Sequence, residues 1–296
     1  MQYYDQDTLI YLNDKFVRAN NATVDLFGQS LHYGYGAFEG LRAYSTHNGT
    51  RIFKAEEHFE RLKNSCEAIG LPYRWDHRDL IERTYELLEV NKLRGAYIRP
   101  LVYSGSNMHL TTSNTANLMI AAWEWAPYLG QNLLRVNISK IQRPNPKSFP
   151  TDAKVSGQYI NSILATSDAI QQGFDEALLM DQEGFVAQAS SENLFIEKDN
   201  KIYTPPLGNI FPGISRETVK EICKSLNFEI IEKRLTIKEV YEADSAFLSG
   251  TAAEIIGIKQ VDHVIFPEEW EDTVGSSIQR KYKNLVLEQE NYEVII

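Results

Sequence analysis

Four short segments carry residue types that could do chemistry, although each has an ordinary structural explanation. Lys154 lies in a proline-rich stretch before a predicted helix, and a lysine amine becomes a nucleophile or a proton carrier where its surroundings lower its pKa. Gly213-Ile214-Ser215 opens another predicted helix, whose first amides could bind a phosphate. Arg61 in EHFERL and the turn SGTAA at 249–253 complete the set. Taken singly, these are a surface lysine, a helical partner for Glu57 and two plain turns.

Other catalytic motifs are absent from the sequence. It has no GxSxG, no HExxH and no Walker loop. The glycines of GYGAFEG at 34–40 resemble a dinucleotide loop, but the third glycine is one residue late and the segment precedes a strand. The six histidines are scattered, and Cys66 and Cys223 have no metal-ligand or CxxC spacing. We therefore expect no metal site and two reduced thiols, as in a cytoplasmic protein.

Composition narrows the class further. The formal net charge of −10 and pI near 5.2 argue against a nucleic-acid surface, which needs clustered lysine and arginine. The start of the chain is polar and unlike a signal peptide. The longest apolar stretch, 118–123, is far shorter than the roughly 20 residues that span a bilayer. These features predict a soluble protein.

The positions of the elements predict an α+β fold in two domains, because 296 residues exceed one small core. We expect a smaller domain at 1–125, the interdomain loop and the start of the second domain at 126–137, and a larger, cofactor-binding domain at 138–296. Expected strands lie at 9–17 (a hairpin turning at Asn13-Asp14), 38–44, 51–53, 96–103, 116–125, 133–139, several within 176–203, 245–248 and 254–259. Expected helices lie at 54–69, 76–90 (capped by Asp76), 157–172, from PGISRE to about 226, and 268–288. In the helix at 157–172 we expect Ile160, Ile163, Leu164 and Ile170 to face inward.

Seven segments together resemble the branched-chain aminotransferases, which belong to the fold type IV group of pyridoxal-phosphate enzymes. They occur in the family's order and cover most of the chain: LHYGYGAFEGLRAY (31–44), EHFERL (57–62), AYIRPL (96–101), PTDAKVSGQY (150–159), SSENLF (190–195), PPLGNIFPGISRE (205–217) and LSGTAAEI (248–255). The resemblance implies the fold of that group, pyridoxal 5′-phosphate as cofactor, and transfer of amino groups between branched-chain L-amino acids and 2-oxoglutarate in amino-acid biosynthesis.

The resemblance also implies a cofactor role for each matched position. Lys154 would form the internal Schiff base with the cofactor aldehyde and shuttle a proton between Cα and C4′. Arg61 would hold the phosphate with its fork of donors. Further cofactor contacts would come from Tyr159 (to the phenolic oxygen), the amides of Ile214 and Ser215, and Thr251.

Substrate contacts follow from the same resemblance. Tyr97, with the amides of Thr251 and Ala252, would bind the α-carboxylate. Arg99, beside tyrosine hydroxyls, would accept the γ-carboxylate of glutamate. The apolar side chain would lie against Tyr33, Phe38 and Tyr128, and Arg42 would link pocket strands.

One position departs from the family pattern. Gln188, 34 residues after Lys154, stands where the family has a glutamate paired with the cofactor's pyridine nitrogen. A carboxylate keeps that nitrogen protonated and the ring a strong electron sink. Glutamine can donate to an unprotonated nitrogen or accept from a protonated one. We therefore expect slower transamination or an altered reaction. Phe211, where the family prefers an aliphatic residue, is a milder change.

Three functions remain open at this point. They are a branched-chain L-amino acid aminotransferase, another fold type IV reaction (D-amino acid transamination or an aminodeoxychorismate-type lyase), and a binding protein with little turnover. Keeping Lys154, Arg61 and Tyr159 argues against the last. The resemblance also implies a homodimer, open to further assembly, in which a loop near 104–114 closes the partner's pocket.

Overall fold

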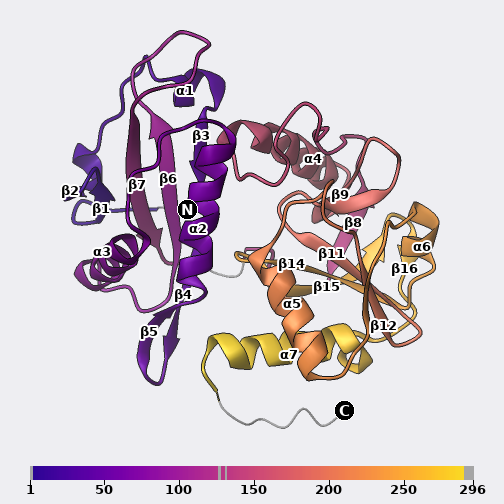
Figure 1. The fold of residues 1–296 in the computed structure, drawn as a ribbon. Coiled ribbons are helices and arrows are strands. Elements are labelled where there is room, and N and C mark those ends of the chain that lie inside the picture. Colours follow the sequence, from indigo (N-terminus) through magenta and orange to yellow (C-terminus); the bar gives the residue numbers. More distant parts are fainter. Residues whose placement is uncertain (1–2, 126–127, 131, 290–296) are drawn as a thin grey trace. The chain divides into compact units, whose positions relative to one another are not determined.

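The computed structural model describes residues 3–125, 128–130 and 132–289. Contacts divide the chain into two compact units, Met1–Ala126 with Ala153–Gln158, and Pro127–Asp152 with Tyr159–Ile296. The expected second domain therefore contains a short segment, Ala153–Gln158, that packs with the first unit. Each unit has one sheet and its own helices (Figure 1), which confirms the α+β class.

The sheet of the first unit has seven strands in the order β2-β1-β7-β6-β4-β5, with β3 also paired to β6. They are β1 (Leu9–Leu12), β2 (Lys15–Arg18), β3 (Gly36–Phe38), β4 (Leu41–Thr46), β5 (Gly49–Ile52), β6 (Ala96–Ser104) and β7 (Ala116–Trp123). The predicted hairpin is confirmed: Asn13 and Asp14 take positive φ angles of 46° and 66°, which asparagine and aspartate tolerate well. The strand expected at 38–44 is interrupted, because Glu39 and Gly40 separate β3 from β4.

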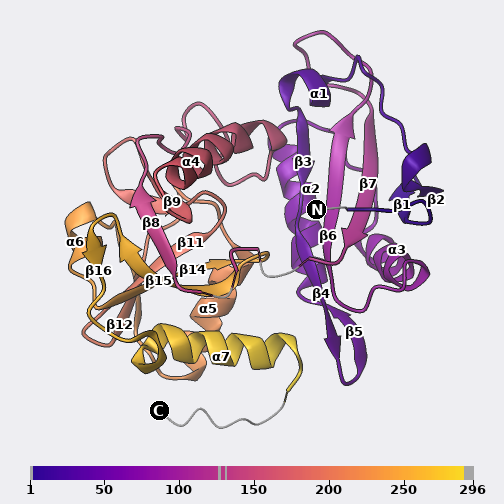
Figure 2. The same cartoon turned by 180° about the vertical axis from the view of Figure 1, so that it is seen from behind.

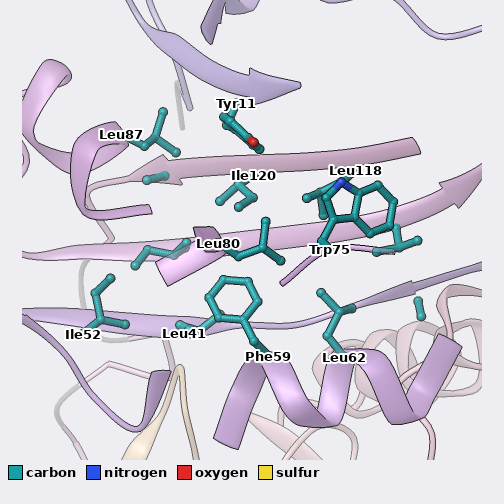
Figure 3. Close-up of a cluster of buried hydrophobic side chains, with 14 of the residues drawn as sticks. Tyr11, Leu41, Ile52, Phe59, Leu62, Trp75, Leu80, Leu87, Leu118 and Ile120 are labelled. Atoms are coloured by element: carbon teal, nitrogen blue, oxygen red, sulfur yellow. The ribbon is translucent and has the colours of Figure 1, made fainter. Parts of the chain in front are cut away.

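Two long helices cover one face of this sheet. They are α2 (Ala55–Ala68) and α3 (His77–Val90); a short helix that the sequence did not predict, α1 (Gln29–Tyr33), precedes β3. Phe59 and Leu62 from α2, with Leu80 and Leu87 from α3, are fully buried against the strands (Figure 3). Asp76 caps α3 as predicted, since its carboxylate accepts from the first amides of the helix.

The second unit has a nine-stranded sheet in which six strands close into a ring. The order is β10-β9-β8-β15-β14-β11-β12-β13, with β16 paired to β15, and an extra pairing of β10 with β11 completes the ring. The strands are β8 (Leu134–Ile138), β9 (Glu176–Met180), β10 (Val186–Ala189), β11 (Asn193–Lys198), β12 (Lys201–Thr204), β13 (Ile230–Glu232), β14 (Ser245–Gly250), β15 (Glu254–Val261) and β16 (Val264–Ile265). The ring closes through the pair Gln188–Asn193.

The described residues of this unit form four α-helices: α4 (Tyr159–Gln171), α5 (Ile214–Ser225), α6 (Ile237–Tyr241) and α7 (Val274–Val286). Helices α5 and α7 pack together against β14 and β15 (Figure 2). The terminal helix begins later than predicted, after a short 3₁₀ turn at Trp270–Asp272. None of the helices in the described part of the chain has the length and apolar character of a membrane span.

The predicted inward face of α4 is wrong. Its four isoleucine and leucine side chains are between 53% and 60% exposed: Ile160, Ile163, Leu164 and Ile170. The helix instead buries Ala165 and Ala169 against Ala177 and Leu179 of β9. Small alanine side chains let the helix approach the strand closely, so the larger residues are left on the outside of this unit.

Candidate active site

The main chain around Lys154 is fixed from two sides. Lys154 N donates to Ser65 Oγ on α2 at 2.9 Å, and Phe38 N donates to Lys154 O at 3.0 Å. The next residue, Val155, forms an antiparallel bridge with Ala37 of β3. The main chain of the lysine therefore lies on a strand-like segment that belongs to the first unit.

The side chain of Lys154 shares an aromatic ring with a second cation. Its Nζ lies 5.1 Å from the Phe38 ring centroid, and Arg99 Cζ lies 4.6 Å from the same centroid. Arg99 Nη2 also donates to the Tyr97 hydroxyl at 3.1 Å. Four of the predicted residues thus come together in the first unit. Two cations beside one apolar ring suit a ligand that is both anionic and apolar.

Tyr97 is held by two tryptophans that sequence reasoning did not single out. Its ring centroid lies 5.3 Å from that of Trp123 and 4.7 Å from that of Trp125. A Cβ at Gly40 would collide with the Tyr97 hydroxyl, so glycine is required there. The tryptophans stand at the end of an apolar strand, where a packing role is the ordinary expectation. Their contact with Tyr97 connects them to the site.

Arg61 is held by a buried carboxylate rather than by Glu57. Arg61 Nε donates to Glu39 Oε1 at 2.6 Å and its Nη2 donates to Glu39 Oε2 at 2.8 Å. His58 Nδ1, 2.8 Å from Oε2, donates to the same carboxylate. Glu39 and His58 are buried. Sequence reasoning missed both, although Glu39 belongs to a segment that carried the resemblance.

The charges of this cluster follow from burial and pairing. Burial alone would raise the pKa of Glu39, but the Arg61 guanidinium, with His58, holds that pKa well below its usual range. Burial lowers the pKa of His58, so its imidazole is neutral and donates through Nδ1. The cluster is therefore a fixed ion pair in which Glu39 holds one edge of the guanidinium.

The predicted residues of the second unit gather at one end of three neighbouring strands. Gln188 of β10 pairs with Asn193 of β11, which pairs with Ser249 of β14. Thr251 and Ala252 follow directly after β14. Ser249 Oγ is buried and has no hydrogen-bond partner among the described residues. Such a hydroxyl is costly to leave unpaired, which suits a site that takes a polar ligand.

The start of α5 lies at the same end. Its first residues, Ile214 and Ser215, follow Gly213, which has no side chain to cap the helix. A Cβ at Gly213 would collide with Asn193 Oδ1, which places the helix start beside β11. The first amides are therefore not capped by a side chain, and the helix dipole adds positive potential for an anion.

Gln188 is buried and its side-chain amide contacts main chain at both ends. Phe211 N donates to Gln188 Oε1 at 2.7 Å, and Gln188 Nε2 donates to Ala189 O at 3.2 Å. Asn193 Nδ2 donates to Phe211 O at 2.9 Å. The hydrogen bond from Phe211 N thus joins the two positions, 188 and 211, at which the sequence predicted a departure from the family pattern.

The remaining predicted residues occupy less defined places. Tyr159 begins α4 in the second unit near Arg143, whose pKa burial lowers to about 10 while Tyr159 counteracts that shift. Tyr33 lies on α1 with its hydroxyl donating to Met108 O at 3.4 Å, and Arg42 lies on β4 opposite Tyr97. Tyr33 and Phe38 belong to the first unit and Tyr128 to the second. The convergence of these three around one apolar side chain stays a prediction.

A buried acid, Glu176, supports the segment that carries Gln188. Its Oε1 accepts from Ser190 Oγ, from Thr166 Oγ1 at 3.0 Å and from the amide of Ala177. Burial raises the pKa of Glu176 above its usual value, even though these hydrogen bonds oppose the shift. The folded protein thus favours the protonated acid more than the unfolded chain does.

Exchanging Glu176 for glutamine is expected to flatten the pH dependence of stability. The raised folded pKa means that the stability contributed by Glu176 is present below the unfolded pKa of about 4.3 and is lost as the pH rises toward the folded value. Glutamine keeps a neutral carbonyl acceptor and has no such titration. Melting temperatures of both proteins are measured between about pH 5 and pH 8. The melting temperature of the variant should increase relative to that of the wild type as the pH rises. A constant difference would contradict a raised pKa.

Comparison with known proteins identifies the family of this chain. The Amino-transferase class IV family model matches residues 36–261. A branched-chain-amino-acid aminotransferase of Pseudomonas aeruginosa is 39% identical over 97% of this chain and 95% of its own, and that of Escherichia coli K12 is 34% identical over 93% and 92%. The solved branched-chain aminotransferase from Thermoproteus uzoniensis with norvaline superposes with a TM-score of 0.91 at 34% identity, covering 96% of this chain and 96% of its own. The solved branched-chain aminotransferase from a T.th. strain with N-(5′-phosphopyridoxyl)-L-glutamate superposes with a TM-score of 0.91 at 35% identity, covering 96% of this chain and 95% of its own. The chain belongs to the class IV amino-transferases.

Proposed function

We propose that this enzyme transfers the amino group of the branched-chain L-amino acids leucine, isoleucine and valine to 2-oxoglutarate. As a class IV amino-transferase it is a transaminase that uses pyridoxal 5′-phosphate. The observation that carries the proposal is the placement of Lys154 Nζ and Arg99 Cζ within 5.1 Å and 4.6 Å of the Phe38 ring centroid. This placement brings together an amine (Lys154), an apolar wall (Phe38) and a cation that can bind a carboxylate (Arg99).

The residues present fit the cofactor. A phosphate needs donors, which α5 offers through first-turn amides that no side chain caps. The buried Ser249 hydroxyl lacks a partner in the described structure, and Thr251 follows two residues later. When bound, the cofactor supplies an aldehyde for an amine and a ring that withdraws electrons from the substrate Cα.

Each residue then has one task. Lys154 would hold the cofactor through Nζ and, once released, would move the proton at the substrate Cα. Arg61, held by Glu39 through Nε and Nη2, would bind the phosphate together with the amides of Ile214 and Ser215 and with Thr251. Tyr159 would donate to the phenolic oxygen. This division of roles is supported by the cluster geometry within each unit.

The substrate assignments follow the same chemistry. Tyr97, with the amides of Thr251 and Ala252, would bind the α-carboxylate, while Tyr33, Phe38 and Tyr128 would surround the aliphatic side chain. Arg99, bonded to the Tyr97 hydroxyl, would accept the γ-carboxylate of glutamate. Norvaline, 4-methylvaleric acid and a phosphopyridoxyl-L-glutamate adduct in related structures support a site for both apolar and acidic side chains.

Donor screening tests the proposal. The purified enzyme with cofactor is mixed with L-leucine, L-glutamate or D-alanine, and the absorbance of the bound cofactor and the keto acid released are followed. Conversion by both L-amino acids supports the proposal. Conversion of D-alanine alone would favour another fold type IV reaction, an alternative that Gln188 keeps open.

We further propose that the enzyme works as a homodimer in the cytoplasm. Large apolar side chains are exposed in two regions of the chain, which we treat as two patches. The first joins α1 to the loop at 104–114 through Gln29 Nε2, which donates to His109 O and Thr111 O. The second is the outer face of α4. A second copy presents the same patches and can bury them isologously, and the two buried, unpaired cysteines fit a reducing compartment.

Replacing Ile163 by glutamate is expected to weaken this dimer. The side chain is 60% exposed at the middle of the α4 face, so a charge costs the folded unit little but cannot be buried in an interface without a penalty. Light scattering over a range of concentrations should show an increase in dissociation constant of about 30-fold or more, from roughly 2 kcal/mol. Ile265→Glu is the matched control, because Ile265 is 61% exposed on β16. Equal behaviour of the two variants would argue against α4 as the interface.

A further inference from the structure

The side-chain amide of Gln188 is held in one orientation. Its Oε1 accepts from Phe211 N at 2.7 Å and its Nε2 donates to Ala189 O at 3.2 Å. A main-chain N–H can only donate and a carbonyl can only accept. Both contacts therefore require the same assignment of oxygen and nitrogen.

The surroundings prevent the opposite orientation. A flipped amide would set Nε2 against the Phe211 N–H and Oε1 against the Ala189 carbonyl, leaving buried donors and acceptors unpaired, which is unfavourable. Rotation of the Phe211 peptide is opposed from the other side, because Asn193 Nδ2 donates to Phe211 O at 2.9 Å. Gln188 is 3% exposed, so water does not replace these partners. The side-chain oxygen of Gln188 is thus fixed as the acceptor of the Phe211 main-chain N–H.

We propose that Gln188 offers the cofactor ring an N–H donor and thereby keeps the pyridine nitrogen unprotonated. This inference rests on the proposed function and on the family resemblance, which implies that position 188 faces that nitrogen. One N–H of Nε2 is used by Ala189, and the second is the group left for a ligand. A donor pairs with the lone pair of a neutral pyridine nitrogen and is repelled by a pyridinium N–H. A carboxylate at this position could instead accept from Phe211 N with one oxygen and from a pyridinium with the other.

The consequence is an enzyme with a weaker electron sink than a glutamate at position 188 would give. Proton removal at the substrate Cα then depends more on Lys154 and on the fixed charges around it. Asn193 and Phe211 contribute indirectly, as positioning residues that hold the amide. The state of the ring nitrogen is a property of the resting holoenzyme, so it can be measured without turnover.

The test is the nitrogen-15 NMR signal of pyridoxal 5′-phosphate labelled at the ring nitrogen and bound to the enzyme. Free labelled cofactor above and below its own ring pKa supplies the two reference positions. We expect the wild type at the unprotonated position and Gln188→Glu at the protonated one. Glu192→Gln is the matched control: it removes the neighbouring buried carboxylate, which accepts from Ser191, and should leave the signal unchanged.

The outcomes separate this inference from the proposed function. Cofactor attached to Lys154, as shown by borohydride trapping, with a protonated nitrogen in the wild type would overturn the inference alone. A signal that moves in Glu192→Gln but not in Gln188→Glu would overturn it too. Failure to trap any cofactor on Lys154 would overturn both. If Gln188→Glu does not fold, the position of the wild-type signal relative to the two references still shows whether the ring nitrogen is protonated.

Discussion

Replacing Lys154 by alanine is expected to lower the rate of amino-group transfer by about 10⁴-fold, the upper range for loss of a positioned proton carrier. The fold should survive, because the contacts to Ser65 Oγ and from Phe38 N use the main chain of residue 154, which alanine keeps. What is lost is the amine beside the Phe38 ring. Single-turnover mixing with L-leucine, with released keto acid as the readout, measures the effect.

Lys147→Ala is the control for this experiment. Lys147 lies in the same proline-rich stretch, is exposed, and donates through its main-chain amide to Asn145 Oδ1. Its loss should leave the rate within about twofold, since it forms no part of the cluster at Phe38. Partial recovery of the Lys154→Ala variant with added methylamine would identify the missing group as an amine. A Lys154→Ala enzyme with the wild-type rate would rule out the assigned role.

Much of the fold could be predicted from local chemistry. The Asn13-Asp14 turn and the Asp76 cap depend on neighbouring residues alone, and both are found as expected. The face of α4 could not be predicted in the same way. Periodicity identifies the apolar residues of a helix, but the buried face is chosen by the surface that the helix meets. Here β9 accepts Ala165 and Ala169, and Ile163 is left outside.

The site shows the same limit. Motifs located Lys154, Arg61 and Gln188, because their types and order are readable along the chain. The hydrogen-bond partners of these residues could not be predicted from the sequence, because the partners come from elements distant along the chain. Glu39 is 22 residues from Arg61, and Phe211 is 23 residues from Gln188. Helical spacing suggested Glu57 for Arg61, whereas the sheet brings in a buried carboxylate. Partners set the direction of a side chain and its charge, and thus its chemistry.

Replacing Glu39 by glutamine is the second change with a large expected effect. Removing one partner of a buried ion pair leaves the other charge uncompensated, which costs about 3–5 kcal/mol. Glu39 is fully buried and accepts from Arg61 Nε, Arg61 Nη2 and His58 Nδ1. We expect a large fall in melting temperature and weaker binding of pyridoxal 5′-phosphate, because Arg61 loses its fixed direction.

The pH dependence of that loss distinguishes a paired carboxylate from a packing effect. The folded pKa of Glu39 lies well below its usual range, so its contribution is present above the unfolded pKa of about 4.3 and is lost as the pH falls toward the folded value. The stability gap between the wild type and Glu39→Gln should therefore be constant near neutral pH and shrink on acidification. Glu57→Gln, an exposed carboxylate on the same helix as Arg61, should show almost no gap at any pH. For the cofactor, Glu39→Gln should weaken binding of pyridoxal 5′-phosphate more than that of pyridoxal, since in the proposed function Arg61, which Glu39 holds, binds the phosphate. Equal weakening of both would place the role of Glu39 in the fold alone.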